Sequence, residues 1–232
     1  MTKPLAIISG GAKGVGLAFT QRLIAEGYAV LSFDTAPHSF EHADLVTVNA
    51  DSSQRADVDQ IVKMAAEIGG LQMVVNNARI WQPTPLNSSW QQLLDDWELI
   101  MDTNVRGALM LSRATVPLLK ESGGHIINIS STDVLPPKQT PTNPPDSDLY
   151  NASMWALNGF TDAWSKRLAK YDICVNSICL GKLSEEFLPM ADVAQLLIDV
   201  ISSGRTGENF GAWPGEPVTI GDQPPLHKRI TG

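Results

Sequence analysis

The stretch that decides the fold is Leu5-Ala-Ile-Ile-Ser-Gly-Gly-Ala-Lys-Gly-Val-Gly16. The apolar run 5–9 predicts a buried strand, and the apolar spacing over 14–27 predicts a helix. Glycines between a strand and a helix let the backbone approach a diphosphate, and the first helical turn offers it free N–H groups. The stretch therefore predicts a dinucleotide-binding turn whose contact residues are Gly10, Lys13, Gly14, Val15 and Gly16.

The residue after the second predicted strand (28–33) bears on the type of dinucleotide. This residue is Asp34, and a carboxylate here can accept hydrogen bonds from the adenosine ribose and repels a 2′-phosphate. The sequence therefore favours NAD(H). Lys13 lies inside the glycine turn and can pair with a 2′-phosphate, so NADP(H) is the alternative.

Strand and helix patterns alternate along the rest of the chain. Further strands are predicted over 44–48, 72–76, 125–130, 173–178 and 218–220, and helices over 56–68, 90–120 (one long helix or two in series), 149–170 and 191–203. This alternation predicts a parallel sheet covered on both faces. Right-handed crossovers give a Rossmann-like, doubly wound sheet of about seven strands, in three α/β/α layers, as a single domain over 1–232.

The composition excludes several kinds of partner and site. A net charge of −8 argues against nucleic acid and membrane surfaces. We expect no secretory signal, and no apolar run reaches the ~20 residues that cross a bilayer. Cys174 and Cys179 fall on opposite sides of a strand-like run and are too far apart for a disulfide, which indicates a reducing, cytoplasmic setting. The histidines show no metal-ligand spacing, so no metal site is expected.

Several motifs occur in a recognisable order. They are Gly10-x-x-x-Gly14-x-Gly16, Asp51 after the third strand, Asn76-Asn77-Ala78, Trp97 followed by Asn104, the strand 126–131 ending in Ser131, Tyr150-Asn-Ala-Ser153, and Val175-Asn-Ser-Ile178 followed by Gly181. In this order they resemble the short-chain dehydrogenase/reductase family over nearly the whole chain.

The resemblance implies hydride transfer between a nicotinamide and a carbinol or carbonyl carbon. Ser131 would hydrogen-bond the substrate oxygen, Tyr150 would give or take its proton, and Asn104 would hold a water in a proton relay. Beyond the glycine turn and Asp34, the residues that would contact the cofactor are Asp51, Ser52, Asn77, Ala78, Tyr150 and Gly181.

One position breaks the family pattern. The residue four after Tyr150 is Met154, where the family has a lysine that binds the nicotinamide ribose and lowers the pKa of the tyrosine. A phenol is a poor base at neutral pH without such help. We therefore expect ordinary alcohol oxidation to be badly impaired unless another cation substitutes.

Candidate pocket residues follow from the other departures. Arg79 replaces the glycine of Asn-Asn-Ala-Gly and is either exposed to solvent or a clamp for an anionic substrate or cofactor group. Lys182 is either a solvated loop residue or a substitute cation. Asp133 is either a loop cap or an alternative acid/base, and Trp81, like Met154, can contribute to the pocket wall. The proline-rich insert 136–146 is a stiff surface loop or a further wall.

Three functions remain open. The first is an oxidoreductase with a modified proton relay, for which reduction of a carbonyl or imine tolerates the missing lysine best. The second is a non-redox dehydratase or epimerase. The third is a nucleotide-binding sensor or partner subunit without turnover. The resemblance also implies a homodimer or homotetramer through the helices near 104–120 and 150–170, with Trp164 and Leu168 suited to the buried face.

Overall fold

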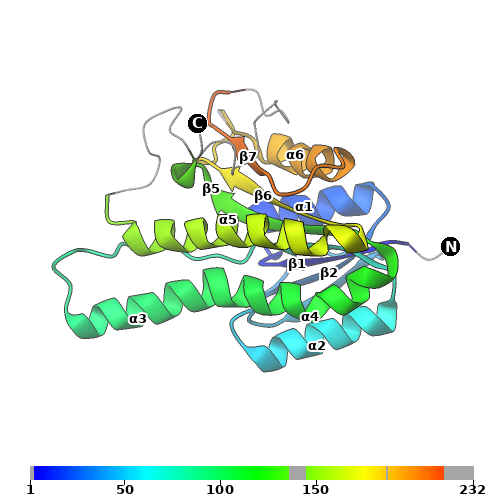
Figure 1. The fold of residues 1–232 in the computed structure, drawn as a ribbon, viewed down its shortest axis with the longest axis horizontal. Coiled ribbons are helices and arrows are strands. Elements are labelled where there is room, and N and C mark those ends of the chain that lie inside the picture. The colour runs from blue at the N-terminus through cyan, green and yellow to red at the C-terminus, as the bar shows by residue number, and fades with distance from the viewer. Residues whose placement is uncertain (1–2, 136–144, 187, 217–232) are drawn as a thin grey trace.

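A seven-stranded parallel sheet forms the centre of the molecule, in the order β3-β2-β1-β4-β5-β6-β7 (Figure 1). The computed structural model describes residues 3–135, 145–186 and 188–216. The strands are β1 Leu5–Ser9, β2 Ala29–Asp34, β3 Leu45–Asn49, β4 Leu71–Asn76, β5 Gly124–Ser131, β6 Ile173–Leu180 and β7 Asn209–Ala212. The predicted doubly wound, Rossmann-like architecture is confirmed.

Helices cover both faces of this sheet, which gives three layers (Figure 1). Helices α1 (Gly14–Ala25) and α6 (Met190–Ser202) pack on one face. On the other face lie α2 (Arg55–Ile68), α4 (Gly107–Ser122) and α5 (Asp148–Leu168). Helix α3 (Trp90–Met101) leads into α4 and extends away from the sheet.

Alternating side chains explain why each strand is buried on both faces. In β1, Ala6 and Ile8 belong to the core beneath α1 and α6, whereas Leu5 and Ile7 belong to the core beneath α2, α4 and α5. Successive side chains of a strand point to opposite faces, so an unbroken apolar run suits a doubly covered sheet. The predicted apolar face of the first helix is likewise confirmed by the buried Val15, Phe19 and Leu23.

The strand order reverses between β1 and β4. From β1 the order continues to β2 and β3 on one side, and from β4 it continues to β5, β6 and β7 on the other. Ligands of open α/β sheets bind beside such a reversal, at the carboxyl ends of the strands. The glycine turn follows β1 at this edge, and Asn77 follows β4. The fold therefore brings both segments to the place where a crevice is expected.

A short π-helical segment, Asp102–Arg106, joins α3 to α4. The predicted helix over 90–120 is thus two helices in series around one wide turn. Single π turns inside α-helices are rare and often lie at functional sites. Here the turn contains the buried Asn104.

Buried polar side chains connect the sheet to α5, the helix that carries Tyr150. The amide of Asn128 on β5 accepts a hydrogen bond from Asn76 Nδ2 (2.8 Å) and donates one to Thr161 Oγ1 on α5 (2.8 Å). Thr161 in turn shares a 2.7 Å bond with Ser177 Oγ on β6. Because these groups are buried, the bonds fix how α5 lies on the sheet.

One strand was missed by the sequence analysis, and two predicted segments lie wholly or mostly outside the described residues. The seventh strand is β7, which was missed because Asn-Phe-Gly-Ala lacks an apolar run and contains residues that strands disfavour. The predicted strand 218–220 and most of the insert 136–146 lie outside the described residues. Trp164, which is suited to a subunit interface by resemblance, is 9% exposed, packs in the core under α4 and α5, and lines a separate hollow with Leu168.

Cys174 and Cys179 are not joined by a disulfide. Over residues 3–135, 145–186 and 188–216, no helix combines the length and the apolar character that crossing a membrane requires.

We expect Asn128→Ala to lower the free energy of unfolding by about 1–3 kcal/mol, because it removes two buried hydrogen bonds. Urea denaturation measures this change. Asn49→Ala is the matched control, since the exposed Asn49 amide makes one bond to Thr35 O and its loss costs less than about 0.5 kcal/mol. Equal effects of the two substitutions would contradict the role given to the buried bonds.

Candidate functional site

The glycine turn after β1 holds backbone shapes and contacts that exclude side chains. Gly10 and Gly14 have φ angles of 67° and 55°, in the left-handed region that favours glycine. A Cβ on Gly16 would lie 2.1 Å from the carbonyl oxygen of Gly10. The turn is therefore tightly wound, and its backbone is open to a ligand.

Asn77 locks this turn to the end of β4. Its side-chain Nδ2 donates to the carbonyl oxygens of Ser9 (3.1 Å) and Gly10 (2.8 Å). In return, the backbone N–H groups of Asn77 and Ala78 both donate to Ser9 Oγ, at 3.1 Å each. These four hydrogen bonds thus join the glycine turn after β1 to the segment after β4, on the two sides of the strand reversal.

The N-terminus of α1 is free to bind an anion. Its N-cap residue, Lys13, makes no capping bond from its side chain, and the first turn holds no acidic residue. No heavy atom lies within 4 Å of a Cβ built on Gly14. The unpaired N–H groups and the partial positive charge of this helix end therefore face open space, as a bound phosphate requires.

Two backbone amides hold the carboxylate of Asp34. Its Oδ2 accepts from Ala12 N at 3.1 Å and its Oδ1 from Ala36 N at 2.9 Å. The carboxylate is fixed between the glycine turn and the loop after β2. Each oxygen keeps a further lone pair that can accept from a sugar hydroxyl.

Ser32 and His38 form a hydrogen-bonded pair, and Ser32 packs against Gly11 of the glycine turn. A Cβ on Gly11 would meet Ser32 Oγ at 2.0 Å, and this hydroxyl lies 3.0 Å from His38 Nε2. Burial lowers the pKa of His38, and the charge of Asp34 opposes that shift. The neutral ring therefore prevails at pH 7, and it anchors the loop that follows Asp34.

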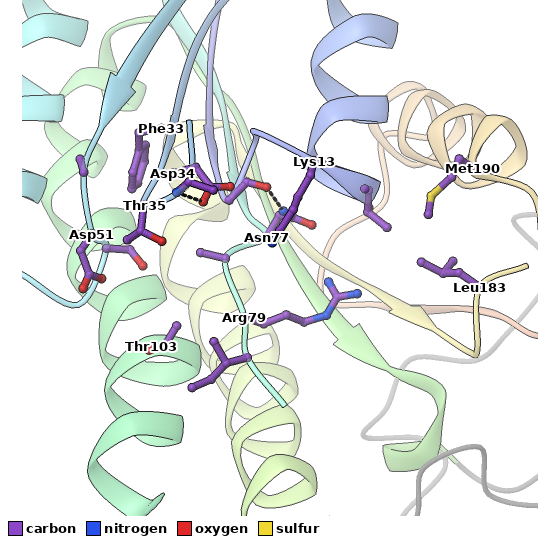
Figure 2. Close-up of a pocket in the computed structure, with 18 residues that line it drawn as sticks. Lys13, Phe33, Asp34, Thr35, Asp51, Asn77, Arg79, Thr103, Leu183 and Met190 are labelled. Carbon is purple, nitrogen blue, oxygen red and sulfur yellow. Dashed lines mark hydrogen bonds between the residues drawn. The ribbon is translucent and has the colours of Figure 1, made fainter. Parts of the chain in front are cut away.

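These elements line one pocket of about 380 Å³ (Figure 2). Ten residues predicted from the sequence line it: Gly10, Lys13, Gly14, Val15, Asp34, Asp51, Ser52, Asn77, Ala78 and Arg79. Sequence reasoning missed Phe33, Thr35, Ala36, Ala50, Ile80, Thr103, Leu183 and Met190. The first six are chain neighbours of predicted residues, which is the signal that could have found them. Nothing in the sequence pointed to Leu183 or Met190.

The predicted catalytic side chains lie outside this pocket's lining. Ser131 ends β5 and is 3% exposed, and its Oγ accepts a bond from Asp133 N at 3.2 Å. Tyr150 lies in the first turn of α5 and is 8% exposed. Within the described part of the chain, no hydrogen bond to its hydroxyl is found. Its phenol oxygen is thus available to a ligand that reaches it.

Met154 is fully buried one turn after Tyr150. It packs with the tyrosine in a small apolar cluster completed by Ala108, Val134 and Leu157. On this side the ring of Tyr150 therefore packs against apolar groups. Met154 therefore supports the tyrosine from inside the core and is not part of an open pocket wall.

Asn104 uses its side chain to hold the chain after β4. Its Oδ1 accepts from Ile80 N (2.8 Å), and its Nδ2 donates to Ile80 O and to Ser153 Oγ, both at 3.0 Å. Ser153 Oγ then donates to the backbone oxygen of Tyr150 at 2.7 Å. Both amide donors are thereby committed to protein groups, so the predicted relay water would have to bind elsewhere on this residue.

The remaining predicted residues are scattered around the site. Trp81 is 44% exposed and donates from Nε1 to Ser147 Oγ at 2.9 Å, so it ties its loop to the start of α5. Lys182 is exposed, and Asp133 is half-buried in a short 3-10 turn. Gly181 donates its N–H to Ala212 O at 2.9 Å, and Pro214 leaves no room for a Cβ there. The described residues include no cluster of three side chains suited to a metal ion.

Comparison with known proteins places this geometry in a family. The family model described as short chain dehydrogenase matches residues 4–190. The chain is 30% identical over 201 residues to galactitol 2-dehydrogenase of Agrobacterium fabrum, covering 83% of this chain and 75% of that protein. It is 28% identical over 190 residues to an uncharacterized oxidoreductase of Staphylococcus aureus, covering 78% of each.

Solved structures agree with the sequence comparison. A short-chain dehydrogenase/reductase from Serratia marcescens has a TM-score of 0.78 and 25% identity, over 91% of this chain and 96% of that one. A 3-ketoacyl-(acyl-carrier-protein) reductase from Brucella melitensis, complexed with NADH, has a TM-score of 0.79 over 94% and 100% of the two chains. At 23% identity, this second likeness shows the fold alone. From the match over residues 4–190 and these relatives, the chain belongs to the short-chain dehydrogenase family of oxidoreductases.

Proposed function

We propose that this oxidoreductase uses NAD(H) and works mainly as a reductase of a small activated carbonyl or imine. The observation that carries the proposal is the pocket at the strand reversal. There the glycine turn, a free helix N-terminus and the fixed Asp34 carboxylate line one cavity. Phosphate, ribose and adenine each require one of these features or the adjoining apolar wall.

The residues present fit the nucleotide. The glycine turn and the first turn of α1 would hold the diphosphate. Asp34 would accept from the adenosine ribose, and Asp51 and Ser52 would border the adenine. Asn77 and Ala78 would form the floor beneath the sugars. When bound, a reduced nicotinamide supplies a hydride to an electrophilic carbon.

The protein's own part in reduction is to orient the substrate and donate a proton. Ser131 Oγ accepts from Asp133 N, which leaves its own hydrogen free to bond a substrate oxygen. A neutral phenol is an adequate proton donor at pH 7, so Tyr150 can serve a reduction without a neighbouring cation. Oxidation instead needs a proton acceptor, and Met154 supplies neither the charge nor the donor of the lysine that the family has at this position.

A second candidate function is a nucleotide-binding protein without turnover. The apolar cluster that contains Met154 and Tyr150 favours this candidate. A fully buried methionine beneath Tyr150 gives a site that can bind the nucleotide and contribute little to proton transfer. In either case we propose self-association through α4 and α5, as the family resemblance implies. Large apolar side chains support it that are exposed on α5 and on α3, the helix that leads into α4, namely Trp155, Trp90, Leu94, Trp97 and Leu99.

The first experiment is nucleotide binding. We expect NADH to bind in titration calorimetry, and to bind more tightly than NADPH because Asp34 repels a 2′-phosphate. Gly16→Ala should abolish binding, since its Cβ would meet Gly10 O at 2.1 Å. Gly159→Ala is the control, because nothing lies within 4 Å of that position. No binding of either nucleotide at millimolar concentration would refute the proposal.

The second prediction separates chemistry from binding. With a panel of activated carbonyls and imines, Tyr150→Phe should lower kcat by about 10²–10⁴-fold through loss of the proton donor. The affinity for NADH should stay within about twofold, because the nucleotide pocket is not lined by Tyr150. Undiminished reduction by the variant, followed at 340 nm, would show that another group donates the proton.

The third prediction concerns the missing lysine. A cation about 4 Å from the phenol contributes about 4 kcal/mol at an effective dielectric of about 20, or about three pKa units. Met154→Lys should therefore move the pH at half-maximal alcohol oxidation downward, by up to about three units. Met154→Leu keeps the apolar volume and should leave the profile unchanged.

Met154 is fully buried, so the lysine variant must be shown to remain folded by thermal unfolding. A folded Met154→Lys protein that loses an existing reductase activity would show that methionine serves a different chemistry.

A further inference from the structure

Arg79 is a half-buried cation without a counter-charge among the described residues. It lines the 380 Å³ pocket, and no ion pair or hydrogen bond joins its guanidinium to another residue in the described ranges. Partial removal of a guanidinium from water is unfavourable unless an anion accompanies it. The pocket lining also holds Lys13 and the carboxylates of Asp34 and Asp51, but neither carboxylate is paired with this guanidinium.

The backbone on both sides of Arg79 is fixed. Before it, Ala78 N donates to Ser9 Oγ at 3.1 Å, and Ala78 Cα lies 2.8 Å from a Cβ built on Gly10. After it, Ile80 is held through its N–H and its carbonyl by Asn104. The backbone of Arg79 is therefore held in place directly beside the glycine turn.

The side chain of Arg79 lines the cavity. Figure 2 shows Arg79 pointing from the loop after β4 toward Leu183 and Met190, with Lys13 approaching from the glycine turn above. Neither Ser131 nor Tyr150 lines this pocket. The guanidinium therefore belongs to the part of the site where phosphates are expected, and not to the part where the substrate's oxygen would lie.

We propose that Arg79 binds the diphosphate of the nucleotide from the β4 side, opposite the amides of the glycine turn. The inference rests on the proposed function, because it needs a dinucleotide in the pocket. A guanidinium presents paired donors that match phosphate oxygens, so it adds charge-assisted bonds to those of the backbone. The chain would then bind its nucleotide through an additional cation at Arg79. Near Tyr150 it lacks a cation, because Met154 stands where the family has a lysine.

The test is titration calorimetry with three probes: NADH, ADP and adenosine, the last by competition against NADH. Arg79→Ala should weaken NADH and ADP by about tenfold or more, as expected for loss of a charged hydrogen bond. Adenosine, which has no phosphate, should stay within about twofold. Arg79→Lys should recover part of the loss, because it keeps the charge without the paired donors.

The matched control is Arg113→Ala. Arg113 is an exposed arginine on α4 that borders a separate hollow. This substitution removes the same charge and should leave all three affinities within about twofold. Thermal unfolding should be the same for wild type and Arg79→Ala, since Arg79 makes no bond within the described structure.

Two results would overturn the inference while leaving the proposed function intact. One is unchanged ADP and NADH affinity in Arg79→Ala, which would assign the guanidinium to another anion, such as a charged substrate. The other is equal weakening of adenosine and ADP, which would mean that Arg79 shapes the pocket and does not contact phosphate. Failure of the wild-type protein to bind NADH would instead refute the proposed function, and the inference with it.

Discussion

The structure depends on the close contact between the glycine turn and the end of β4. Gly10 and Gly16 leave no space for side chains there, and Asn77 fills the remaining gap with two hydrogen bonds to the backbone of the turn. This contact joins the two halves of the sheet where the strand order reverses. The contact also fixes the position at which α1 begins and the backbone position of Arg79. The location of the pocket follows from these two positions.

The site separates into two regions of different physical character. The pocket at the strand reversal is polar, with backbone amides, two carboxylates and two cations around one cavity. The region around Tyr150 is apolar on the side of Met154, and its polar bonds run through Ser153 and Asn104 to the loop after β4. Under the proposed function, cofactor affinity and proton transfer would therefore depend on different residues.

The sequence predicted the strands and helices that have strong patterns, because burial on both faces makes continuous apolar runs and helix faces make regular spacing. It failed at β7, whose four residues carry neither signal. In the pocket, residues after β1, β2 and β4 were predictable because glycines and carboxylates mark them.

Leu183 and Met190 were not predictable, because they reach the pocket only through the course of the loop between β6 and α6. The partners of Asn104 were equally hidden, since an asparagine in a helical pattern gives no sign of what its amide will bond.

The π turn at Asp102–Arg106 has a consequence for how α3 relates to α4. One additional residue in a helix corresponds to about 100° of rotation at 3.6 residues per turn. A single helical wheel drawn across both helices is therefore out of phase on one side of the turn. Trp90 and Trp97 on α3 are exposed, whereas Leu111 and Leu119 on α4 are buried in the core, so the face that α3 presents cannot be read by extending the α4 pattern across the turn.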